Sequence, residues 1–396
     1  MGSTAPCRVE NGLSDGPGSG VLASDRTAGI FCTGTYQYEL PRRLIAQHPL
    51  ENRDQSRLMV LRKADGEMEH VRFFQIGDYL EEGDLLVVNN SRVFPARILG
   101  SKPSGGRVEL MLIRPASFSN NPKSAADPVN LEAGEWLCLT RCSGRLMKGQ
   151  VLSFQDGVQA EVIDGSRAEG DLWKVRFNRE GPGLLAWFEE VGLVPLPPYI
   201  KRGQPDDPAG DLSSDRVNYQ TLFAKTVGSV AAPTAGFHFT QGLCQELEDS
   251  GIRFCEITLH VGQATFLPIR TDDLRRHALW PERFSVCEET AEAIREARRE
   301  GRRIVAVGTT VVRCLESIAG DGGEIRPKEG WASLFILPGH RFRVVDALIT
   351  NFHLPQSSLL VLVSAFSGLD RILGAYREAV RREYRFYSYG DCMLIQ

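Results

Sequence analysis

The fold is decided by residues 304–318, which read IVAVGTTVVRCLESI. The first four, Ile304–Val307, form a short apolar block of the kind that fills a buried strand. After Gly308, the segment Thr309–Ile318 has the pattern of a helix, whose free N–H groups suit an anionic or polar ligand group. A strand that runs directly into a helix is typical of an α/β fold with a largely parallel sheet.

The same alternation of strand and helix recurs along most of the chain. Further strands are predicted at 84–89, 252–261 and 344–350, and helices at 240–251, 357–366 and 370–384. Thr240 is a suitable N-cap for the first of these helices. Ser285 and Glu288 have the spacing of a capping box, which predicts one more helix that stops at Gly301.

Between residues 96 and 187 the pattern changes to short β-like stretches separated by Gly, Pro and Asp, as in a small barrel or sandwich. We therefore predict an α/β fold: a larger α/β domain with an inserted small all-β barrel domain. The larger domain comprises residues 35–96 and 190–396, and the barrel residues 97–189. Residues 1–34, rich in Gly, Ser and Pro, are predicted to be a disordered tail.

The composition is that of an ordinary globular protein, with 42% hydrophobic residues and a net charge of −4. This balance argues against indiscriminate coating of nucleic acid, although it permits a local basic face. Nine cysteines without a Cys-x-x-Cys pair indicate reduced thiols in a cytosolic protein. The apolar runs are too short to span a bilayer, so we expect a cytoplasmic chain with no membrane partner.

The common catalytic and cofactor motifs are absent from the sequence. It contains no Gly-x-Gly-x-x-Gly loop, no Walker lysine loop, no Gly-x-Ser-x-Gly elbow and no His-Glu-x-x-His pair. We therefore expect no metal and no cofactor, and a site that works by positioning and acid–base chemistry.

Polar residues follow several predicted strands, at the edge where ligands gather in α/β sheets. Three of these places carry a histidine: His238 after a run of small residues, His260 at a strand end and His353 after another strand. One histidine there is more often a core residue than a catalyst, but three favour a site. Asp346 interrupts an apolar run and needs a partner, for which we expect Arg313.

Nine blocks of sequence carry a family resemblance. They include DLLVVNNSRVFPAR at 84–97, SVAAPTAGFHF at 229–239, AVGTTVVR at 306–313, VVDALITNFHLP at 344–355 and YRFYSYGD at 384–391. At these blocks the chain closely resembles the S-adenosylmethionine:tRNA ribosyltransferase-isomerase family of queuosine biosynthesis. The blocks run in order from about residue 36 to residue 396, so the match is more specific than any single motif.

The resemblance implies a transferase and isomerase that uses S-adenosylmethionine as a substrate and not as a cofactor. Its ribosyl part goes to the aminomethyl group of 7-aminomethyl-7-deazaguanine at the tRNA wobble position. Adenine and methionine leave, and the product is epoxyqueuosine-tRNA. The family fold is an α/β domain with an inserted β-barrel, which agrees with the pattern above. The expected partners are this tRNA and S-adenosylmethionine, and the expected state is a monomer or weak oligomer.

The reaction needs a base and an acid but no metal, because a sulfonium is already a good leaving group. We assign catalysis to His238, His260, Asp346 and His353, and leave open which histidine is base and which is acid. Substrate binding is assigned to Asn89, Asn90, Arg92, Arg97, Glu109, Thr234, Gly236, Thr309, Thr310 and Arg313. The tRNA contact is assigned to Lys102, Arg107, Arg381, Arg385 and Tyr389. For the basic residues, a solvated surface is the alternative.

Trp280 departs from the family pattern, because it stands where a second histidine is usual. One alternative function is therefore a drifted paralogue that binds tRNA or S-adenosylmethionine without turnover. The presence of His238, His260 and Asp346 argues against it. Another alternative is an S-adenosylmethionine methyltransferase, against which the missing glycine-rich loop after the first strand argues.

Overall fold

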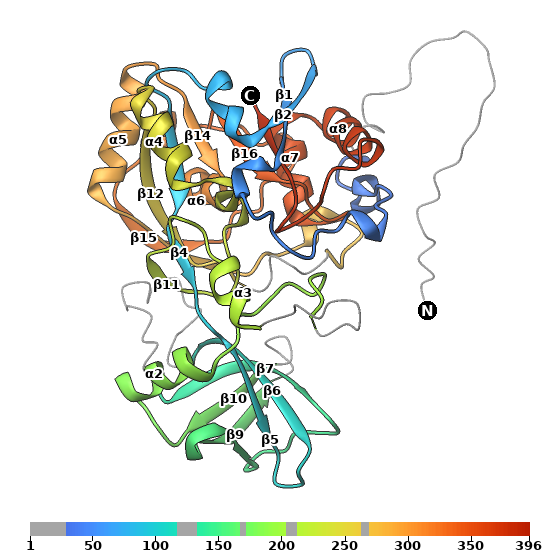
Figure 1. Cartoon of the computed structure of the whole chain (residues 1–396), viewed down its shortest axis with the longest axis vertical. Helices are drawn as coiled ribbons and strands as arrows, with labels where there is room; N and C mark the ends of the chain where they lie inside the picture. The colour runs from blue at the N-terminus through green and yellow to red at the C-terminus, as the bar shows by residue number, and fades with distance from the viewer. Residues whose placement is uncertain (1–28, 117–132, 167–171, 203–211, 263–268) are drawn as a thin grey trace, which may run out of the picture.

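The computed structural model describes residues 29–116, 133–166, 172–202, 212–262 and 269–396. A larger α/β part occupies one end of the molecule and a closed β-barrel the other (Figure 1). The predicted α/β fold with an inserted small barrel is confirmed.

A nine-stranded mixed sheet forms the centre of the larger part, in the order β15-β13-β12-β3-β14-β16-β17-β1-β2. Its strands are β1 (Arg57–Leu61), β2 (Met68–Arg72), β3 (Leu85–Asn89), β12 (Arg253–Leu259), β13 (Glu282–Val286), β14 (Ile304–Val307), β15 (Lys328–Ala332), β16 (Ala347–Asn351) and β17 (Cys392–Ile395). The four neighbours β12, β3, β14 and β16 are parallel, as predicted, whereas antiparallel pairs occur on either side.

Both faces of this sheet are covered, which explains the continuous apolar runs in the sequence. Leu85 and Val87 of β3 pack into one core cluster, with α5 to α8, and Leu86 and Val88 into a second, with α4. The helices of this part are α3 (Leu212–Asn218), α4 (Gln241–Asp249), α5 (Glu288–Arg299), α6 (Thr309–Ile318), α7 (Ser358–Ser367) and α8 (Leu369–Arg381). The predicted strand and helix at 304–318 are both confirmed.

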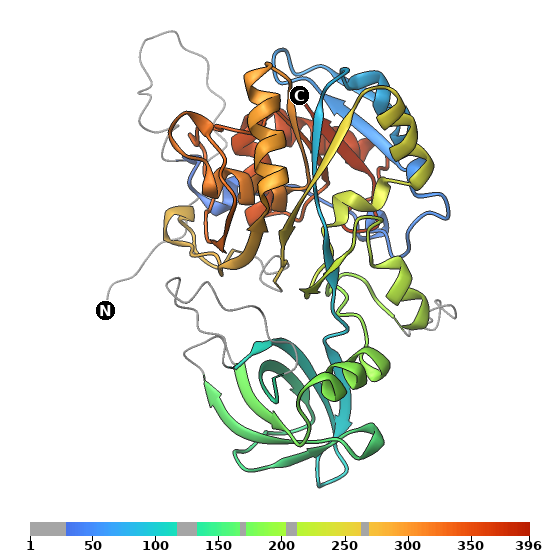
Figure 2. The same ribbon diagram turned by 90° about the vertical axis from the view of Figure 1, so that its left-hand side faces the viewer.

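The barrel closes in the order β10-β7-β6-β5-β8-β9. Its strands are β5 (Arg97–Ser101), β6 (Arg107–Pro115), β7 (Glu135–Cys142), β8 (Val151–Ser153), β9 (Gln159–Ser166) and β10 (Leu172–Phe177). Helix α2 (Pro182–Val191) contributes Trp187 and Phe188 to the barrel core. Arg97, on entry, is bridged to Leu193, on exit, so the two crossings of the chain are adjacent (Figure 2). Above them, β4 (Ser91–Val93) pairs with β11 (Thr226–Ser229).

Two local predictions are wrong. Ser285 does not cap a helix, because it lies inside β13 and α5 begins only at Glu288. Cys287 occupies the N-cap and makes no side-chain cap bond. Asp346 is not inside a strand: β16 starts at Ala347, and the Asp346 side chain is exposed.

The structure also differs from the prediction at the first described residues. Residues 29–34 were expected in the tail, yet Thr33 is buried and its N–H donates to the carbonyl of Asp272 at 2.9 Å. Residues 1–28 of the predicted tail lie outside the described residues. Within the described ranges no single helix is long and apolar enough to cross a membrane, although α7 and α8, bent by 115°, meet that test as a pair.

Candidate active site

Segments from six strands meet at one edge of the main sheet. The parallel strands β12, β3, β14 and β16 all present their carboxyl ends there. Asn351, the last residue of β16, is paired with Cys392, the first residue of the antiparallel strand β17. Strand β1 is parallel to β17, which brings Ser56, just before β1, to the same edge. Ligands of α/β proteins bind at such an edge.

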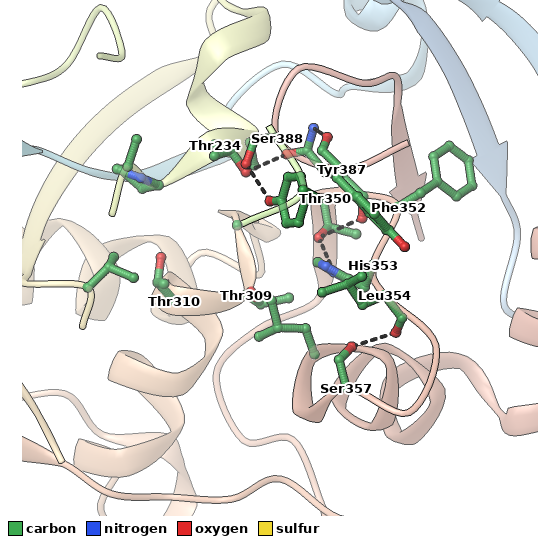
Figure 3. A pocket seen from close by; sticks show the side chains of 18 residues that line it. Thr234, Thr309, Thr310, Thr350, Phe352, His353, Leu354, Ser357, Tyr387 and Ser388 are labelled. Atoms are coloured by element: carbon green, nitrogen blue, oxygen red, sulfur yellow. Dashed lines mark hydrogen bonds between the residues drawn. The ribbon is translucent and has the colours of Figure 1, made fainter. Parts of the chain in front are cut away.

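A cleft enclosing about 640 Å³ opens at this edge. Figure 3 shows Thr309 and Thr310 of α6, Thr350 of β16 with His353 beyond it, and Thr234 with Ser388 around this space. The remaining lining is largely apolar, which is typical of a small-molecule site with a few placed polar groups. The cleft therefore unites three of the loops that the sequence singled out.

His353 is held rigidly on the cleft wall. Its Nε2 is 2.9 Å from Oγ1 of Thr350. Its backbone N–H donates to the hydroxyl of Tyr376 at 3.0 Å, and its carbonyl accepts from the hydroxyl of Tyr38 at 2.5 Å. Burial lowers the pKa of His353 to about 3, so its imidazole is neutral at physiological pH.

His238 lies at the end of a hydrogen-bonded chain that starts in the cleft. Thr234 donates to Oδ1 of Asn351 at 3.0 Å, and Nδ2 of Asn351 lies 3.1 Å from Nε2 of His238. Because Asn351 donates there, the ring proton belongs on Nδ1, which is 2.7 Å from Oγ of Ser56. Burial, followed by the charges of Arg53 and Arg385, lowers the pKa of His238 to about 3. The chain fixes both the orientation and the tautomer of a neutral imidazole.

His260 is less closely tied to the cleft. Its neighbour Val261 lines the space, but His260 itself does not. Gly228, at φ +142°, packs against the ring so closely that a Cβ there would lie 2.8 Å from two ring atoms. Within the described residues Nδ1 of His260 is buried without a hydrogen-bond partner. Burial, with a smaller contribution from Arg283, lowers its pKa to about 4.

The buried histidines predict a pH dependence of stability. The pKa values of His238 and His353 fall from 6.5 in the unfolded chain to about 3 in the folded protein. Their contribution is therefore complete above pH 6.5 and is lost as the pH falls towards 3, because the unfolded state binds protons first. We expect the free energy of unfolding to fall by about 1.4 kcal/mol per pH unit for each histidine in this window.

Urea unfolding at a series of pH values measures this slope. His353→Gln and His238→Gln, which cannot titrate in this range, should each make the dependence less steep. An unchanged slope in both variants would show that other groups cause the acid sensitivity.

The loops that carry threonines owe their shape to small residues. Gly308 has a φ of +100° at the turn from β14 into α6, a conformation that favours glycine, and places Thr309 and Thr310 at the helix start. Gly236 lies against Thr221, where a Cβ would meet the methyl group at 3.0 Å. Gly236 is therefore a packing residue of the loop that presents Thr234.

The structure contradicts two expected roles. Arg313 does not pair with Asp346: its Nη1 binds Glu282 at 2.6 Å, and its other nitrogens donate to the carbonyls of Leu334 and Ala332. These buried contacts use the guanidinium within the fold. Asp346 lies at the amino end of β16, away from the site edge, and its carboxylate accepts from the N–H of Ile304 at 2.8 Å.

Other expected substrate contacts also serve the fold. Asn89 donates to the carbonyl of Leu259 at 2.9 Å and accepts from its N–H at 3.0 Å, extending the pairing of β3 with β12. Asn90 binds the hydroxyl of Thr258 at 2.7 Å and donates to Glu256 at 3.0 Å. Neither residue lines the cleft.

The pair Arg97 and Glu109 belongs to the barrel, where β5 and β6 bring the side chains to 3.0 Å. Arg92 is exposed on β4, and within the described part of the chain no ion pair is formed by it. Of these three residues, only Arg92 leaves its charge available at the surface.

The residues expected to contact the tRNA also divide into those that are bound within the fold and those that are exposed. Lys102 is only 8% exposed and donates to the carbonyl of Ser143. Arg381 binds both oxygens of Glu378, at 2.8 and 2.6 Å. Tyr389 is buried. Arg107 alone is exposed without an ion pair in the described residues.

Sequence reasoning missed Ser56, Thr350 and Asn351 as site residues. Asn351 and Thr350 stood inside a quoted block, directly before His353, and polar residues at the end of a buried strand were the available signal. Ser56 gave no signal, because a serine before a short strand is common. Trp280, the departure from the family pattern, is 43% exposed and does not line the cleft. No group of three metal-ligating side chains occurs among the residues described.

Comparisons with known proteins show the family of the chain. The model of the family described as "Queuosine biosynthesis protein" matches residues 33–395. The chain belongs to this family. An S-adenosylmethionine:tRNA ribosyltransferase-isomerase of Geotalea uraniireducens is 47% identical over 361 residues, covering 91% of this chain and 98% of that protein.

Two further members of the queuosine biosynthesis family extend the comparison. The ribosyltransferase-isomerase of Nitratidesulfovibrio vulgaris strain Hildenborough is 45% identical over 381 residues, covering 95% of this chain and all of that protein. A crystal structure of the S-adenosylmethionine tRNA ribosyltransferase of Thermotoga maritima is 37% identical, with a TM-score of 0.49, covering 91% of this chain and 100% of that one.

Proposed function

We propose that this chain is an S-adenosylmethionine:tRNA ribosyltransferase-isomerase. The observation that carries the proposal is the similarity to enzymes of that name, at 47% identity over nearly the whole length of both chains. The substrates are then S-adenosylmethionine and 7-aminomethyl-7-deazaguanine at the tRNA wobble position. The products are epoxyqueuosine-tRNA, adenine and methionine, and S-adenosylmethionine is consumed as a substrate.

The cleft is the proposed site for S-adenosylmethionine. Its apolar lining suits the uncharged parts of the molecule, and Thr309 and Thr310 stand beside the free N–H groups at the start of α6. A methionine carboxylate is stabilised at such a helix start. This arrangement replaces the role that the sequence assigned to Arg313.

His238 is the proposed general base. The sulfonium acidifies the neighbouring ribose carbon, so a neutral imidazole beside the cleft can take its proton. Nε2 of His238 carries the lone pair of the ring and accepts from Nδ2 of Asn351, which lines the cleft, so the substrate displaces this amide when His238 acts as base. His353, on the same wall, is the proposed partner, and the neutral imidazole of either His353 or His260 donates a hydrogen bond to the departing adenine.

The tRNA contact is proposed for the exposed cations Arg92 and Arg107. A wobble base lies in a single-stranded loop and can be splayed out into a site, while cations hold the neighbouring phosphates. Arg107→Gln and Arg92→Gln are each expected to weaken tRNA binding and to lower the slope of log affinity against log salt by about 1.

Filter binding at several salt concentrations measures these slopes. Arg381→Gln is the matched control: it also removes one exposed positive charge, but one that is already paired with Glu378. If the control changes the slope as much as Arg107→Gln and Arg92→Gln do, the assignment of the tRNA surface is wrong.

The function itself is tested by the products. The protein is incubated with S-adenosylmethionine and tRNA that bears the aminomethyl-deazaguanine, and free adenine and the wobble nucleoside are quantified. Adenine in step with epoxyqueuosine supports the proposal. S-adenosylhomocysteine would indicate methyl transfer, and binding of both substrates without any product would indicate a drifted paralogue. We further propose a cytoplasmic monomer or weak oligomer.

A further inference from the structure

A second, narrower cavity adjoins the cleft. Ser388 lines both spaces, and His238 lines the second one together with Arg53, Ser56 and Tyr389. The second cavity is the smaller of the two: its room for a water-sized sphere is about 20 Å³, against about 70 Å³ for the cleft. It therefore admits a small group rather than a nucleobase.

Two polar groups of this region are buried without a partner. Tyr389 is 3% exposed, lines the cavity, and its hydroxyl makes no hydrogen bond in the described residues. Arg385 stands next to the cavity, because its Nη2 donates to the carbonyl of His48 beside the lining residue Pro49. Its Nη1 is buried with no hydrogen-bond partner among the described residues. Such donors are costly to bury unless a ligand satisfies them.

The region also carries positive charge, which the carboxylates of the described residues offset only in part. Arg53 donates to the backbone carbonyls of Asn218 and Gln220 at 2.7 and 3.2 Å and lies 5.0 Å from the ring centre of Phe237. Those contacts hold the guanidinium of Arg53 in place, but neutral carbonyl groups do not neutralise its positive charge. Burial lowers the pKa of both Arg53 and Arg385, and the charge of Asp391 opposes this only in part for Arg385.

The nearest acidic residues are already engaged. Asp391, whose charge reaches Arg385, is paired with Arg57 at 3.1 Å. Asp215, whose charge reaches Tyr389, is paired with Arg202 at 2.8 Å. The described residues thus leave an excess of positive charge and unpaired donors around one small cavity.

From this geometry we propose that the cavity beside His238 is an oxyanion subsite, in which Arg53 and Tyr389 hold a phosphate or carboxylate group and the charge of Arg385 lies close by. The proposal rests on the proposed function, because that reaction supplies two such groups: a phosphate of the tRNA next to the target nucleotide, and the carboxylate of S-adenosylmethionine, for which this cavity is the alternative to the start of α6. Either group would be anchored directly beside the proposed base.

The test compares ligand affinities of Arg53→Gln and Tyr389→Phe with the wild type. Calorimetry gives the Kd of S-adenosylmethionine, and filter binding gives the Kd of the substrate tRNA. Losing a charged hydrogen bond should weaken one of them about tenfold or more in Arg53→Gln. A phosphate ligand shows as weaker tRNA binding with a salt slope lower by about 1. A carboxylate ligand shows as weaker S-adenosylmethionine binding, while decarboxylated S-adenosylmethionine binds wild type and variant alike.

Two controls make the result specific. Arg43→Gln removes an exposed arginine that is paired with Glu383, so it should leave both affinities unchanged. Tyr389→Phe removes only an unpartnered hydroxyl and is expected to fold with an unchanged or higher Tm. Its ligand affinity should nevertheless fall several-fold. Unchanged affinities for both ligands in folded Tyr389→Phe and Arg53→Gln would overturn the subsite.

Inorganic phosphate separates this proposal from the proposed function. At matched ionic strength, phosphate should raise the Tm of the wild type more than chloride does, and less so in Arg53→Gln. A phosphate effect in a protein that releases no adenine would overturn the proposed function and support the subsite. Adenine release with no phosphate effect and unchanged ligand affinities would support the proposed function and overturn the subsite.

Discussion

His238→Ala is expected to lower the rate of adenine release by a factor of about 10²–10⁴, the usual contribution of a positioned general base. The side chain is buried, its Nδ1 is 2.7 Å from Ser56, and its Nε2 faces Asn351 on the cleft wall. No other imidazole of the described residues occupies this position. Single-turnover measurements with saturating S-adenosylmethionine and tRNA isolate the chemical step from binding.

The control for this prediction is Ser56→Ala, which keeps the imidazole and removes only the group that orients it. We expect about a tenfold loss of rate with an unchanged Kd for S-adenosylmethionine, because a positioning contact is worth less than the base itself. His260→Ala is the informative comparison: His238 is hydrogen-bonded to Asn351 on the cleft wall, whereas Nδ1 of His260 has no hydrogen-bond partner among the described residues. Near-normal turnover in a folded His238→Ala protein would exclude His238 from the mechanism.

Arg313→Met is expected to lower the free energy of unfolding by about 3–5 kcal/mol. It removes one partner of a buried ion pair and leaves the carboxylate of Glu282, which is 4% exposed, without its cation. The contact also matters for the site, because Oε1 of Glu282 accepts from the N–H of Gly262 at 2.9 Å and so joins α6 to the loop after β12. Urea unfolding monitored by circular dichroism measures the loss.

The double variant Arg313→Met with Glu282→Gln is the matched control. Removing both charges eliminates the buried negative charge that has lost Arg313, so part of the lost stability should return, and the coupling energy follows from the four proteins. The opposite pattern, wild-type stability with lost affinity for S-adenosylmethionine in Arg313→Met, would restore the substrate role that the sequence assigned to this arginine.

Most of the fold was predictable because the sheet is buried on both faces. Strands such as β3 and β14 must then be apolar throughout, and small or polar residues mark where they end. The expectation that strands are apolar throughout also placed Asp346 inside a strand. Val344 and Val345 are apolar, but β16 begins only at Ala347. The prediction for Ser285 is wrong for a similar reason: residue spacing alone does not distinguish the last residues of a strand from the N-cap of a helix.

The sequence predicts which loops form the candidate site, but not which side chains contact one another there. A sequence shows that His238 and His353 follow strands, but not that Asn351 connects one of them to the cleft. The sequence also does not show which basic side chains are available to a ligand. Lys102 and Arg313 are buried and bound to other residues of the fold, whereas Arg107 is exposed. Such outcomes depend on residues far apart in the chain, and Ser56, which contacts His238 from 182 residues away, is the clearest case.

The order of the main sheet has a consequence for synthesis on the ribosome. Strand β17 lies between β16 and β1, and Leu58 pairs with Cys392. At about 5–20 residues per second, the roughly 330 residues between them take about 17–70 s to be made. Throughout that time the hairpin of β1 and β2 has no neighbour to join, and its apolar strand β1 stays open to chaperones or to wrong partners. Strand β17 is the last strand to be made, and its pairing with β16 and β1 completes the order of the sheet.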